Sequence, residues 1–317
     1  SGLVVGMTLL VEPADQRAIW KVRDSALGAI SRTPGEKDNW EGWEDAAVPP
    51  AKIGAYLRDF RALLSRYGYS GALYGHLGDG CLHNRIDWDP TTDEGIAQWL
   101  AFVDEAADLI KQYGGSISGE HGDGQARGAL LPKMYGPVIM QAFERFKDLW
   151  DPDGMMNPGK LIRARGIGED LRHKHHPKPA TAPDTTHLHF HFAEDSGSFE
   201  RALERCVGAG VCRRPAATGG GVMCPSYQAT KDEAHSTRGR AHLLWEMMRG
   251  EVITDGWKSE EVKEALDLCL SCKGCESDCP VHVDVATYKA EFLSHYYEGR
   301  RRPRAAYAMG HIARAAV

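Results

Sequence analysis

Four cysteines near the end of the chain constrain its fold and chemistry more than any other feature. The stretch CLSCKGCESDCP spaces them as Cys-x2-Cys-x2-Cys-x3-Cys-Pro. This spacing is typical of ferredoxin-like proteins, in which the first three cysteines bind one iron–sulfur cluster and the fourth binds another. A zinc ribbon is the alternative, but the run is too compact for one tetrahedral ion to use all four sulfurs. The four are Cys269, Cys272, Cys275 and Cys279.

Three earlier cysteines predict how the ligands are shared between two clusters. Cys224 also precedes a proline, so we expect it to complete the [4Fe-4S] cluster of the first three cysteines of the run. Cys279 would then join Cys206 and Cys212, with an alanine where a middle cysteine would complete the motif. The second cluster is therefore a [3Fe-4S] cluster, a [4Fe-4S] cluster with a non-cysteine ligand such as His235, or absent.

Composition narrows the class of protein further. Seven of the eight cysteines lie between residues 206 and 279, which favours metal binding in a reducing compartment over a disulfide framework. The formal net charge of -6 argues against a nucleic-acid partner.

No apolar run reaches the roughly 18 residues that a membrane span needs. We expect a cytoplasmic protein, with peripheral contact at the inner face of the membrane as the alternative for its basic stretch. That stretch contains Arg300, Arg301, Arg302 and Arg304.

Hydrophobic periodicity predicts an α+β domain over residues 1–165, with helices on one face of its strands. The strands are expected at MTLLVEP and YSGALYGH. Amphipathic helices are expected at PPAKIGAYLRDFRALLSRYG, AQWLAFVDEAADLIKQYGG and VIMQAFERFKDLW, each followed by a glycine or a DPDG stop.

Residues 166–195 are expected to be a linker rich in Pro, Thr and His, with a short strand at HLHFHF. Its histidines either bind a metal or are solvated in a connector. Residues 196–317 are expected to form a mainly α-helical, ferredoxin-like iron–sulfur domain. Its helices are expected at STRGRAHLLWEMMRG and VDVATYKAEFLSHYYEG, with the cysteines in loops between helices.

Two glycine-rich loops carry a second group of candidate ligands. YGHLGDGCLH contains His76 and His83, and SISGEHGDGQAR contains Glu120 and His121. Two histidines and a carboxylate with a spare position make up a catalytic divalent-metal site. Each loop alone is a weak signal, because a lone loop histidine is more often structural. Cys81 lies between the two histidines and either touches the metal or packs.

These segments resemble a known family. YGHLGDGCLH, SISGEHGDGQAR and DPDGMMNPGKL, in that order, resemble the C-terminal half of FAD-linked 2-hydroxyacid dehydrogenases of the vanillyl-alcohol-oxidase type. The cysteine segments resemble the iron–sulfur module fused to some bacterial members. The resemblance implies that the main FAD-binding domain lies upstream and is absent from this chain, which would supply the substrate-binding cap and the electron-transfer module. It implies flavin contacts at Asn157, Pro158, Gly159 and Lys160.

The resemblance also implies roles in catalysis. His76, His83 and Glu120 would hold a divalent ion, which is Zn, Mn or Fe. His121 would accept the proton of the substrate's α-hydroxyl while hydride passes from C2 to the flavin. Arg23 matches an arginine that binds the substrate carboxylate.

Two departures from the family pattern concern the substrate. The hydroxyglutarate branch outside these fusions has asparagine where this chain has Arg85, and a lysine where it has Trp43. Arg85 either binds a second substrate carboxylate or pairs with Asp79 or Asp87. The first choice of substrate is D-2-hydroxyglutarate, oxidised to 2-oxoglutarate, with D-lactate and glycolate as alternatives.

The sequence thus predicts an FAD- and iron–sulfur-dependent 2-hydroxyacid dehydrogenase. Its electrons would leave through the clusters to a quinone or a protein acceptor, and a homo-oligomer is compatible with the pattern. The main alternative is a non-catalytic electron-transfer subunit with structural histidine loops. A zinc hydrolase is disfavoured, because the chain lacks a helical His-Glu-x-x-His motif.

Overall fold

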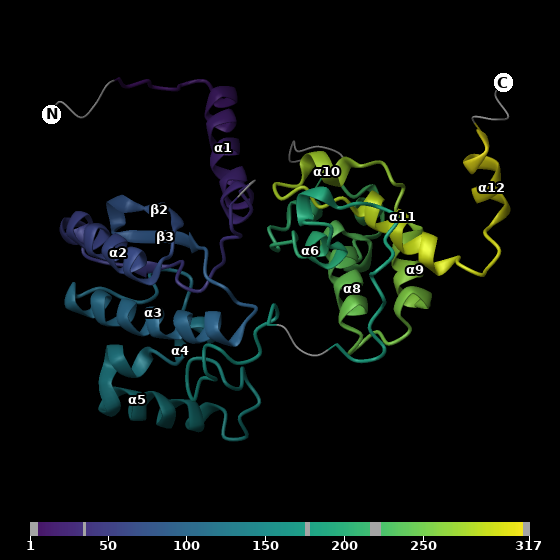
Figure 1. Ribbon diagram of the computed structural model, residues 1–317. Helices are drawn as coiled ribbons and strands as arrows, with labels where there is room; N and C mark the ends of the chain where they lie inside the picture. The colour runs from purple at the N-terminus through teal and green to yellow at the C-terminus, as the bar shows by residue number, and fades with distance from the viewer. Residues whose placement is uncertain (1–5, 34–35, 175–177, 216–222, 313–317) are drawn as a thin grey trace. The chain divides into compact units, whose positions relative to one another are not determined.

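The computed structural model describes residues 6–33, 36–174, 178–215 and 223–312. The chain divides into two compact units (Figure 1). One comprises residues 30–176 and carries the histidine loops. The other comprises residues 1–29 and 177–317 and carries the cysteine motifs.

A small antiparallel sheet organises the unit of residues 30–176. Its strand order is β1-β3-β2, with β1 at Ala46–Ala47, β2 at Gly71–His76 and β3 at Cys81–Ile86. The one-turn helix η2 (Leu77–Asp79) joins β2 to β3. It ends at Gly80, where φ is +79° and an added Cβ would overlap the carbonyl oxygen of Val48. Glycine is therefore required at this turn.

Two long helices cover one face of this sheet. They are α2 (Ile53–Tyr67), preceded by η1 (Pro50–Lys52), and α3 (Asp93–Gln112). Their positions and faces confirm the expected amphipathic helices, and α2 ends at Gly68 in the left-handed conformation, as the glycine stop predicts. The core between the helices and the sheet is rich in aromatic side chains, including Trp43, Tyr56, Phe60, Trp99 and Phe102.

A third helical layer lies beyond α3 in Figure 1. It contains α5 (Leu131–Trp150), which follows the short helix α4 (Gly124–Gly128). The predicted helix at residues 138–150 is confirmed, but α5 starts earlier and is interrupted at Gly136, whose φ of 72° and ψ of 171° are not helical. Pro137 follows this kink, as its missing N–H allows.

Because side chains alternate along a strand, one face of the sheet packs into the core and the other carries the candidate ligands. Leu82 and Ile86 of β3 are each 1% exposed and pack into the core. Side chains alternate along a strand, so Cys81, His83 and Arg85 lie together on the opposite face. The register pairs Tyr74 with His83 and residue 76 with Cys81, so the two histidines of the first loop share this face.

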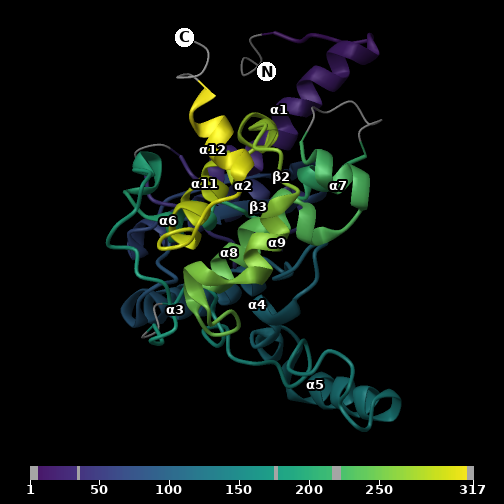
Figure 2. The ribbon, with the colours of Figure 1, turned by 90° about the vertical axis from the view of Figure 1, so that its right-hand side faces the viewer.

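The second unit is helical, which confirms the expected class (Figure 2). Its core joins α6, α8, α9 and α11 around buried side chains such as Phe199, Leu244 and Phe292. The predicted helices at residues 236–250 and 283–299 are confirmed as α8 and α11. The elements are α1 (Pro13–Ser31), η3 (Ala193–Asp195), α6 (Phe199–Leu203), η4 (Val211–Arg213), α7 (Pro225–Thr230), η6 (Glu233–His235), α8 (Thr237–Arg249), η7 (Gly256–Lys258), α9 (Glu260–Asp267), α10 (Gly274–Asp278), α11 (Val285–Tyr296) and α12 (Arg304–Gly310).

The strand expected at residues 7–13 is wrong. Residues 7–11 have no regular structure, and α1 begins at Pro13. Met7, Leu9 and Val11 alternate as a half-buried strand would, yet they are exposed and pair with no strand among the described residues. An apolar alternation specifies a strand only where a neighbouring strand accepts its hydrogen bonds.

The strand expected at HLHFHF is also wrong. The amides of His189 and Phe190 donate to the carboxylate of Glu291 on α11 at 2.8–3.1 Å, in place of a strand partner. Glu291 is fully buried and also contacts His295 Nε2 at 2.7 Å. The segment is therefore fixed by a side chain distant in sequence. Residues 175–177 of the His-rich tract lie outside the described residues.

In the described part of the chain, every helix is too short or too polar to span a membrane.

Candidate active site and cluster ligands

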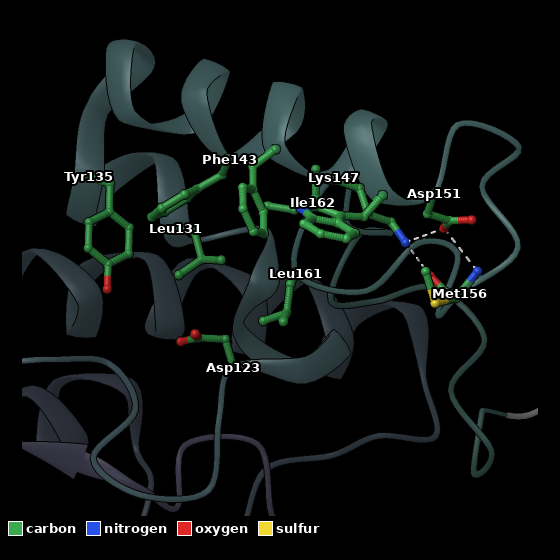
Figure 3. A pocket seen from close by; sticks show the side chains of 11 residues that line it. Asp123, Leu131, Tyr135, Phe143, Lys147, Asp151, Met156, Leu161 and Ile162 are labelled. Carbon is green, nitrogen blue, oxygen red and sulfur yellow. Dashed lines mark hydrogen bonds and ion pairs between the residues drawn. The ribbon is translucent and has the colours of Figure 1, made fainter.

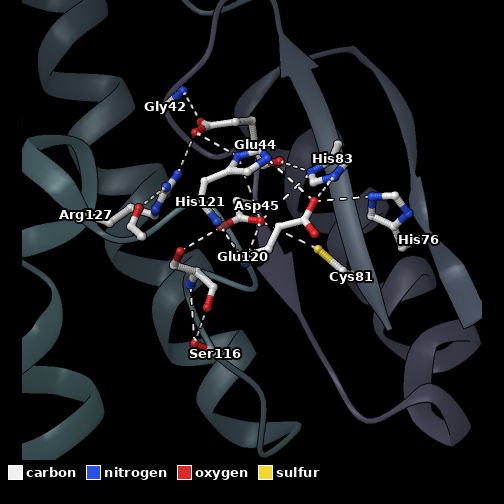
Figure 4. Close-up of polar contacts among 12 residues, drawn as sticks. Gly42, Glu44, Asp45, His76, Cys81, His83, Ser116, Glu120, His121 and Arg127 are labelled. Atoms are coloured by element: carbon white, nitrogen blue, oxygen red, sulfur yellow. Dashed lines mark hydrogen bonds and ion pairs between the residues drawn. The ribbon is translucent and has the colours of Figure 1, made fainter. Parts of the chain in front are cut away.

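Two histidines from the sheet converge on one carboxylate oxygen (Figure 4). Nε2 of His83 lies 3.0 Å from Oε1 of Glu120, and Nε2 of His76 lies 3.3 Å from the same oxygen. His83 comes from β3, His76 from the end of β2, and Glu120 from the loop after α3. The structure thus brings together all three residues expected to hold a divalent ion.

Hydrogen bonding determines the tautomer of His83 and therefore which ring nitrogen points its lone pair at Glu120. Nδ1 lies 2.9 Å from the backbone oxygen of Glu44, which can only accept, so Nδ1 carries the proton. Neutral His83 then presents Nε2 as an acceptor to the acceptor Oε1 of Glu120. A cation between them, either a second proton or a metal ion, satisfies both atoms. A histidine held by a backbone carbonyl in this way is typical of metal ligands.

His121 lies against this group. Its ring stacks on that of His83, with centroids 4.8 Å apart and an interplanar angle of 4°. Its Nδ1 lies 3.9 Å from Asp45 Oδ1 and 4.0 Å from Glu44 Oε1, while its Nε2 faces Glu120 Oε1 at 3.7 Å. The side chain is half exposed. The ring therefore lies among three carboxylates and remains accessible to a substrate.

Asp45 anchors the loop that carries Glu120 and His121, and the sequence analysis missed it. Its carboxylate is fully buried and accepts hydrogen bonds from Ser118 Oγ at 2.6 Å, from the amide of His121 at 2.8 Å and from the amide of Glu120 at 3.1 Å. Burial alone would raise the pKa of Asp45, but these hydrogen bonds lower it below its usual value. The only sequence signal is an acid directly before the buried pair Ala46–Ala47.

Glu44 and Arg127 form a second support behind the site. Arg127 is 3% exposed, and its guanidinium donates to Glu44 Oε1 at 2.9 Å and to the carbonyl of Gly122 at 2.7 Å. Burial opposes ionisation of Glu44, but the charge of Arg127 lowers the net pKa of this carboxyl. Glu44 thus stays ionised, while its backbone oxygen orients His83.

Cys81 belongs to a group of side chains whose ligand atoms lie close enough together to hold a metal ion. Atoms of Asp45, Cys81, His83 and Glu120 all lie within 4.8 Å of one another. The Cys81 thiol, however, donates to Asp45 Oδ1 at 3.5 Å and is buried under Gly119. Burial and the neighbouring carboxylate of Asp45 raise the pKa of Cys81 to about 11. A neutral thiol turned toward Asp45 agrees with a packing role.

Arg85 lies on the same face of β3 as His83, two residues further along. Its side chain is mostly buried and forms an ion pair with exposed Glu41. Neither of the partners expected from the sequence, Asp79 or Asp87, forms an ion pair with it among the described residues. Its Nε is buried and has no hydrogen-bond partner in the described part of the chain, so the guanidinium retains an unused donor.

Arg23 lies on α1 in the other unit, where it is exposed and its guanidinium stacks over the Trp20 ring at 5.3 Å. Its expected contact with the substrate carboxylate stays a prediction.

The segment expected to face the flavin adjoins the His121 loop. Asn157 adopts a φ of 47° and Gly159 a φ of 72°. Lys160 donates to the side chain of Gln125, and the amide of residue 161 contacts the carbonyl of Gly124 at 3.5 Å. Asn157 and Pro158 are exposed. The segment therefore presents accessible backbone and a lysine beside the loop that carries His121.

An open apolar groove of about 530 Å³ lies between α5 and this segment (Figure 3). Asp123 stands at one edge of it, and Lys147 reaches the carboxylate of Asp151 at the other. The groove is lined mainly by large apolar side chains, including Leu131, Tyr135, Phe143, Phe146, Trp150 and Leu161. This surface was not anticipated from the sequence.

The seven clustered cysteines are all placed in or beside short elements of the helical unit. Cys224 precedes α7, Cys212 lies in η4, and Cys275 lies in α10. These three and Cys279 are buried, Cys206 and Cys269 are partly exposed, and Cys272 is exposed. His235, the suggested extra ligand, has its Nδ1 2.9 Å from Thr230 Oγ1, which is compatible with a structural role.

The electrostatic interactions among the cysteines link both expected sets of ligands. Burial raises the pKa of Cys275 to about 11, with further contributions from Asp284 and Cys224. Burial likewise raises the pKa of Cys279, with a further contribution from Cys212. Cys224 thus lies near Cys275 and Cys212 near Cys279, but Cys212 also contributes to the raised pKa of Cys224. The division of the ligands between two clusters therefore stays a prediction.

An unpaired cation indicates that an anionic group fits beside the first set of cysteines. Arg240 Nη2 is buried without a hydrogen-bond partner among the described residues, and the guanidinium interacts electrostatically with Cys269, Cys224 and Cys275. Four thiolates around iron and sulfide would supply the missing negative charge.

Comparison with protein-family models gives two matches. Residues 1–161 match the model of FAD linked oxidases, C-terminal domain, and residues 202–283 match that of the 4Fe-4S dicluster domain. The first match covers the histidine loops and the second covers all seven clustered cysteines. The second match supports iron–sulfur ligation over the zinc-ribbon alternative.

Several characterised proteins are similar to the chain. It is 29% identical to the D-2-hydroxyglutarate dehydrogenase of Pseudomonas putida, over 97% of this chain and 33% of that protein. It is 28% identical to the D-2-hydroxyglutarate dehydrogenase of Escherichia coli, over 95% and 32%. A D-lactate dehydrogenase of Archaeoglobus fulgidus is 38% identical over 38% of this chain and 26% of its own. The chain spans about a third of the length of its curated relatives.

Replacing Asp45 should loosen the candidate metal site. In Asp45→Asn, the side-chain NH2 would replace one carboxylate oxygen, so a donor would face the donors of the Glu120 and His121 loop. We expect this loop to shift because those hydrogen bonds are lost. We expect affinity for Zn²⁺ or Mn²⁺, measured by titration calorimetry after EDTA treatment, to fall about 10- to 100-fold. Asp108→Asn, at an exposed acid on α3, is the control and should leave it unchanged. Equal affinities in both variants would contradict the anchoring role.

Proposed function

The chain belongs to the FAD-linked oxidases, through the C-terminal domain of that family, and from this premise we propose that it is the substrate-binding and electron-transfer part of a D-2-hydroxyacid dehydrogenase. The observation that carries the proposal is the convergence of His76, His83 and Glu120 beside His121, in a chain that also carries a dicluster motif. FAD, bound mostly by a domain outside this chain, supplies the hydride acceptor.

The histidines and Glu120 act on the hydroxyl of the substrate. His76, His83 and Glu120 would hold a divalent cation, which would supply Lewis acidity that lowers the pKa of the α-hydroxyl. The His83 ring is fixed by the carbonyl of Glu44, so its Nε2 is oriented before substrate arrives. Arg127 and Asp45 hold the surrounding loop and need not touch the substrate.

His121 serves as the general base. Its Nδ1 faces the carboxylates of Glu44 and Asp45. The pKa of Glu44 is lowered chiefly by the charge of Arg127 and that of Asp45 by its hydrogen bonds, against the effect of burial. Because Nδ1 faces these two carboxylates, Nε2 is the ring nitrogen proposed to take the hydroxyl proton. The half-exposed ring leaves room for the substrate to approach.

The substrate of first choice is D-2-hydroxyglutarate, oxidised to 2-oxoglutarate. Two observations support it: the named activity of two relatives aligned over nearly the whole chain, and the position of the Arg85 guanidinium on the face that carries His83. A planar guanidinium suits a second carboxylate. D-lactate and glycolate are the alternatives, because another relative of the first domain is a D-lactate dehydrogenase.

Electrons leave through the cysteine-bound clusters to a quinone or a protein acceptor. Cys224, Cys269, Cys272 and Cys275 would hold a [4Fe-4S] cluster, and Cys206, Cys212 and Cys279 a second cluster. The clusters convert a two-electron oxidation into single-electron steps. The alternative, an electron-transfer subunit without catalysis, is disfavoured by the convergence of His76 and His83 on Glu120.

Iron, sulfide and zinc analysis with EPR tests the proposal first. Anaerobically purified full-length protein should contain roughly seven or eight irons, the sum of two clusters. Adding D-2-hydroxyglutarate should change the cluster signals, because the substrate delivers electrons. Reduction of the clusters by D-lactate or glycolate, but not by D-2-hydroxyglutarate, would overturn only the proposed identity of the substrate. Absence of iron would overturn the electron-transfer role and would favour the alternative that the cysteines bind zinc.

Replacing His121 should impair proton abstraction without removing cofactors. His121→Asn keeps the backbone amide that bonds to Asp45 but removes the base. We expect the rate of substrate-driven cluster reduction, followed by stopped-flow absorbance, to fall about 10²- to 10⁴-fold. Metal and iron contents should match those of the wild type. His242→Asn, at an exposed histidine of α8, should leave the rate unchanged. A wild-type rate in His121→Asn would exclude His121 as the base.

Arg85 should distinguish a dicarboxylate from a monocarboxylate substrate. Arg85→Met removes the cation but keeps much of the side-chain volume. We expect kcat/KM for D-2-hydroxyglutarate to fall at least tenfold, since a charged hydrogen bond contributes about 1.5–3 kcal/mol. The value for D-lactate should change less than threefold. Arg66→Met, at an exposed arginine of α2, is the control. An equal loss for both acids would indicate that Arg85 only supports the fold.

A further inference from the structure

Arg240 is a buried cation that the fold itself leaves uncompensated. It lies on α8 and is 2% exposed. Its Nε donates to the carbonyl of Ala265 at 2.7 Å, but Nη2 is buried without a hydrogen-bond partner in the described part of the chain. No carboxylate of the described residues forms an ion pair with it. A guanidinium remains charged in proteins, so burying it in this way is costly unless an anion lies nearby.

The groups that face this charge are cysteines. Burial lowers the pKa of Arg240, whereas the charges of Cys269, Cys224 and Cys275 act in the opposite direction. Thr237, one turn earlier on α8, presents its amide to Cys224 Sγ at 2.9 Å and its Oγ1 at 2.7 Å. The first turns of α8 therefore direct a cation and two polar contacts toward one set of cysteines.

Lys289 of α11 adds a second cation on the Cys269 side. Its Nζ donates to the backbone carbonyl of Cys269 at 2.7 Å and approaches that of Asp267 at 3.4 Å. The lysine is half-buried, and burial lowers its pKa, opposed chiefly by the charge of Cys269. These hydrogen bonds go to uncharged backbone oxygens, so they leave most of the charge of Lys289 uncompensated.

We propose that Arg240, assisted by Lys289, raises the reduction potential of the cluster expected on Cys224, Cys269, Cys272 and Cys275. This inference rests on the proposed function for the presence of that cluster. Reduction adds one electron, taken from the reduced flavin, and neither forms nor breaks a bond. The four thiolates make the assembly anionic, so a buried cation favours the more negative, reduced state.

Among the described residues, no arginine next to the second set of cysteines is buried with an unpartnered nitrogen as Arg240 is, and Arg214, two residues after Cys212, is exposed. Arg205, next to Cys206, forms an ion pair with Asp195 at 2.7 Å. Arg213, next to Cys212, is exposed and pairs with Glu233 at 3.1 Å. Their carboxylates already compensate these arginines, so Arg240 should act on one cluster only, and the other cluster serves as an internal reference.

An EPR-monitored redox titration of the anaerobic, full-length holoprotein tests this assignment. In Arg240→Met, the ratio of reduced to oxidised cluster at a fixed potential should fall about tenfold, which is a shift of 59 mV for a one-electron couple. Arg240→Lys, which keeps the charge, should shift it less. Lys289→Met should shift it in the same direction and serves as the decisive variant if Arg240→Met does not take up iron. Arg238→Gln, at an exposed arginine of the same helix, should leave both clusters unchanged.

The outcomes separate this inference from the proposed function. A wild-type protein without iron would overturn both. Iron at the wild-type level with an unchanged potential in Arg240→Met and Lys289→Met would overturn only the role of the two cations. A parallel shift of both clusters in Arg240→Met would also overturn it, because it would indicate a general structural change.

Discussion

The buried carboxylate of Asp45 joins the three chain segments that form the candidate active site. It stands directly before β1, receives the thiol of Cys81 from β3, and accepts the amides of Glu120 and His121 from the loop after α3. An ionised carboxylate is stable in this position only because Ser118 and the backbone donors replace its hydration. The position of the Glu120 loop, and hence the convergence on His83, depends on these bonds.

Strand register gives the site its second constraint. Because side chains alternate, β3 places Leu82 and Ile86 in the core and His83 on the opposite face. A shift of one residue would bury the histidine against α2 and α3 and expose the apolar residues. The aromatic core formed by these helices therefore specifies the register of the strand and, through it, the direction of the ligand.

The two units use opposite electrostatic arrangements. In the first, the carboxylates of Asp45, Glu44 and Glu120 surround histidine nitrogens, which suits a cation. In the second, Arg240 and Lys289 lie near thiols with few compensating carboxylates, which suits an anionic group. Each arrangement is costly in isolation, because desolvated like charges and unpaired charges both raise the free energy of the fold. Such costs are commonly retained at functional sites.

The sequence by itself determined the helices with strong 3.6-residue periodicity, the ligand-bearing loops and the cysteine set, because local spacing and glycine positions encode them. It identified His76, His83, Glu120 and His121 as a group, which the structure brings together. It failed where pairing between distant segments decides: the apolar alternation at residues 7–13 finds no strand partner, and HLHFHF is held by Glu291 on α11.

Only the tertiary structure revealed the supporting residues. Asp45, Arg127 and Arg240 are buried charged residues whose importance lies in contacts 25 to 83 positions away in the chain, as the bonds to His121, Glu44 and Ala265 illustrate. A buried charge leaves no periodic pattern, and an isolated Asp or Arg in a sequence is usually solvated. Local motifs in the sequence thus identify the ligands of a site. The residues that orient these ligands and set the local electrostatic potential act only after packing has removed water from around them.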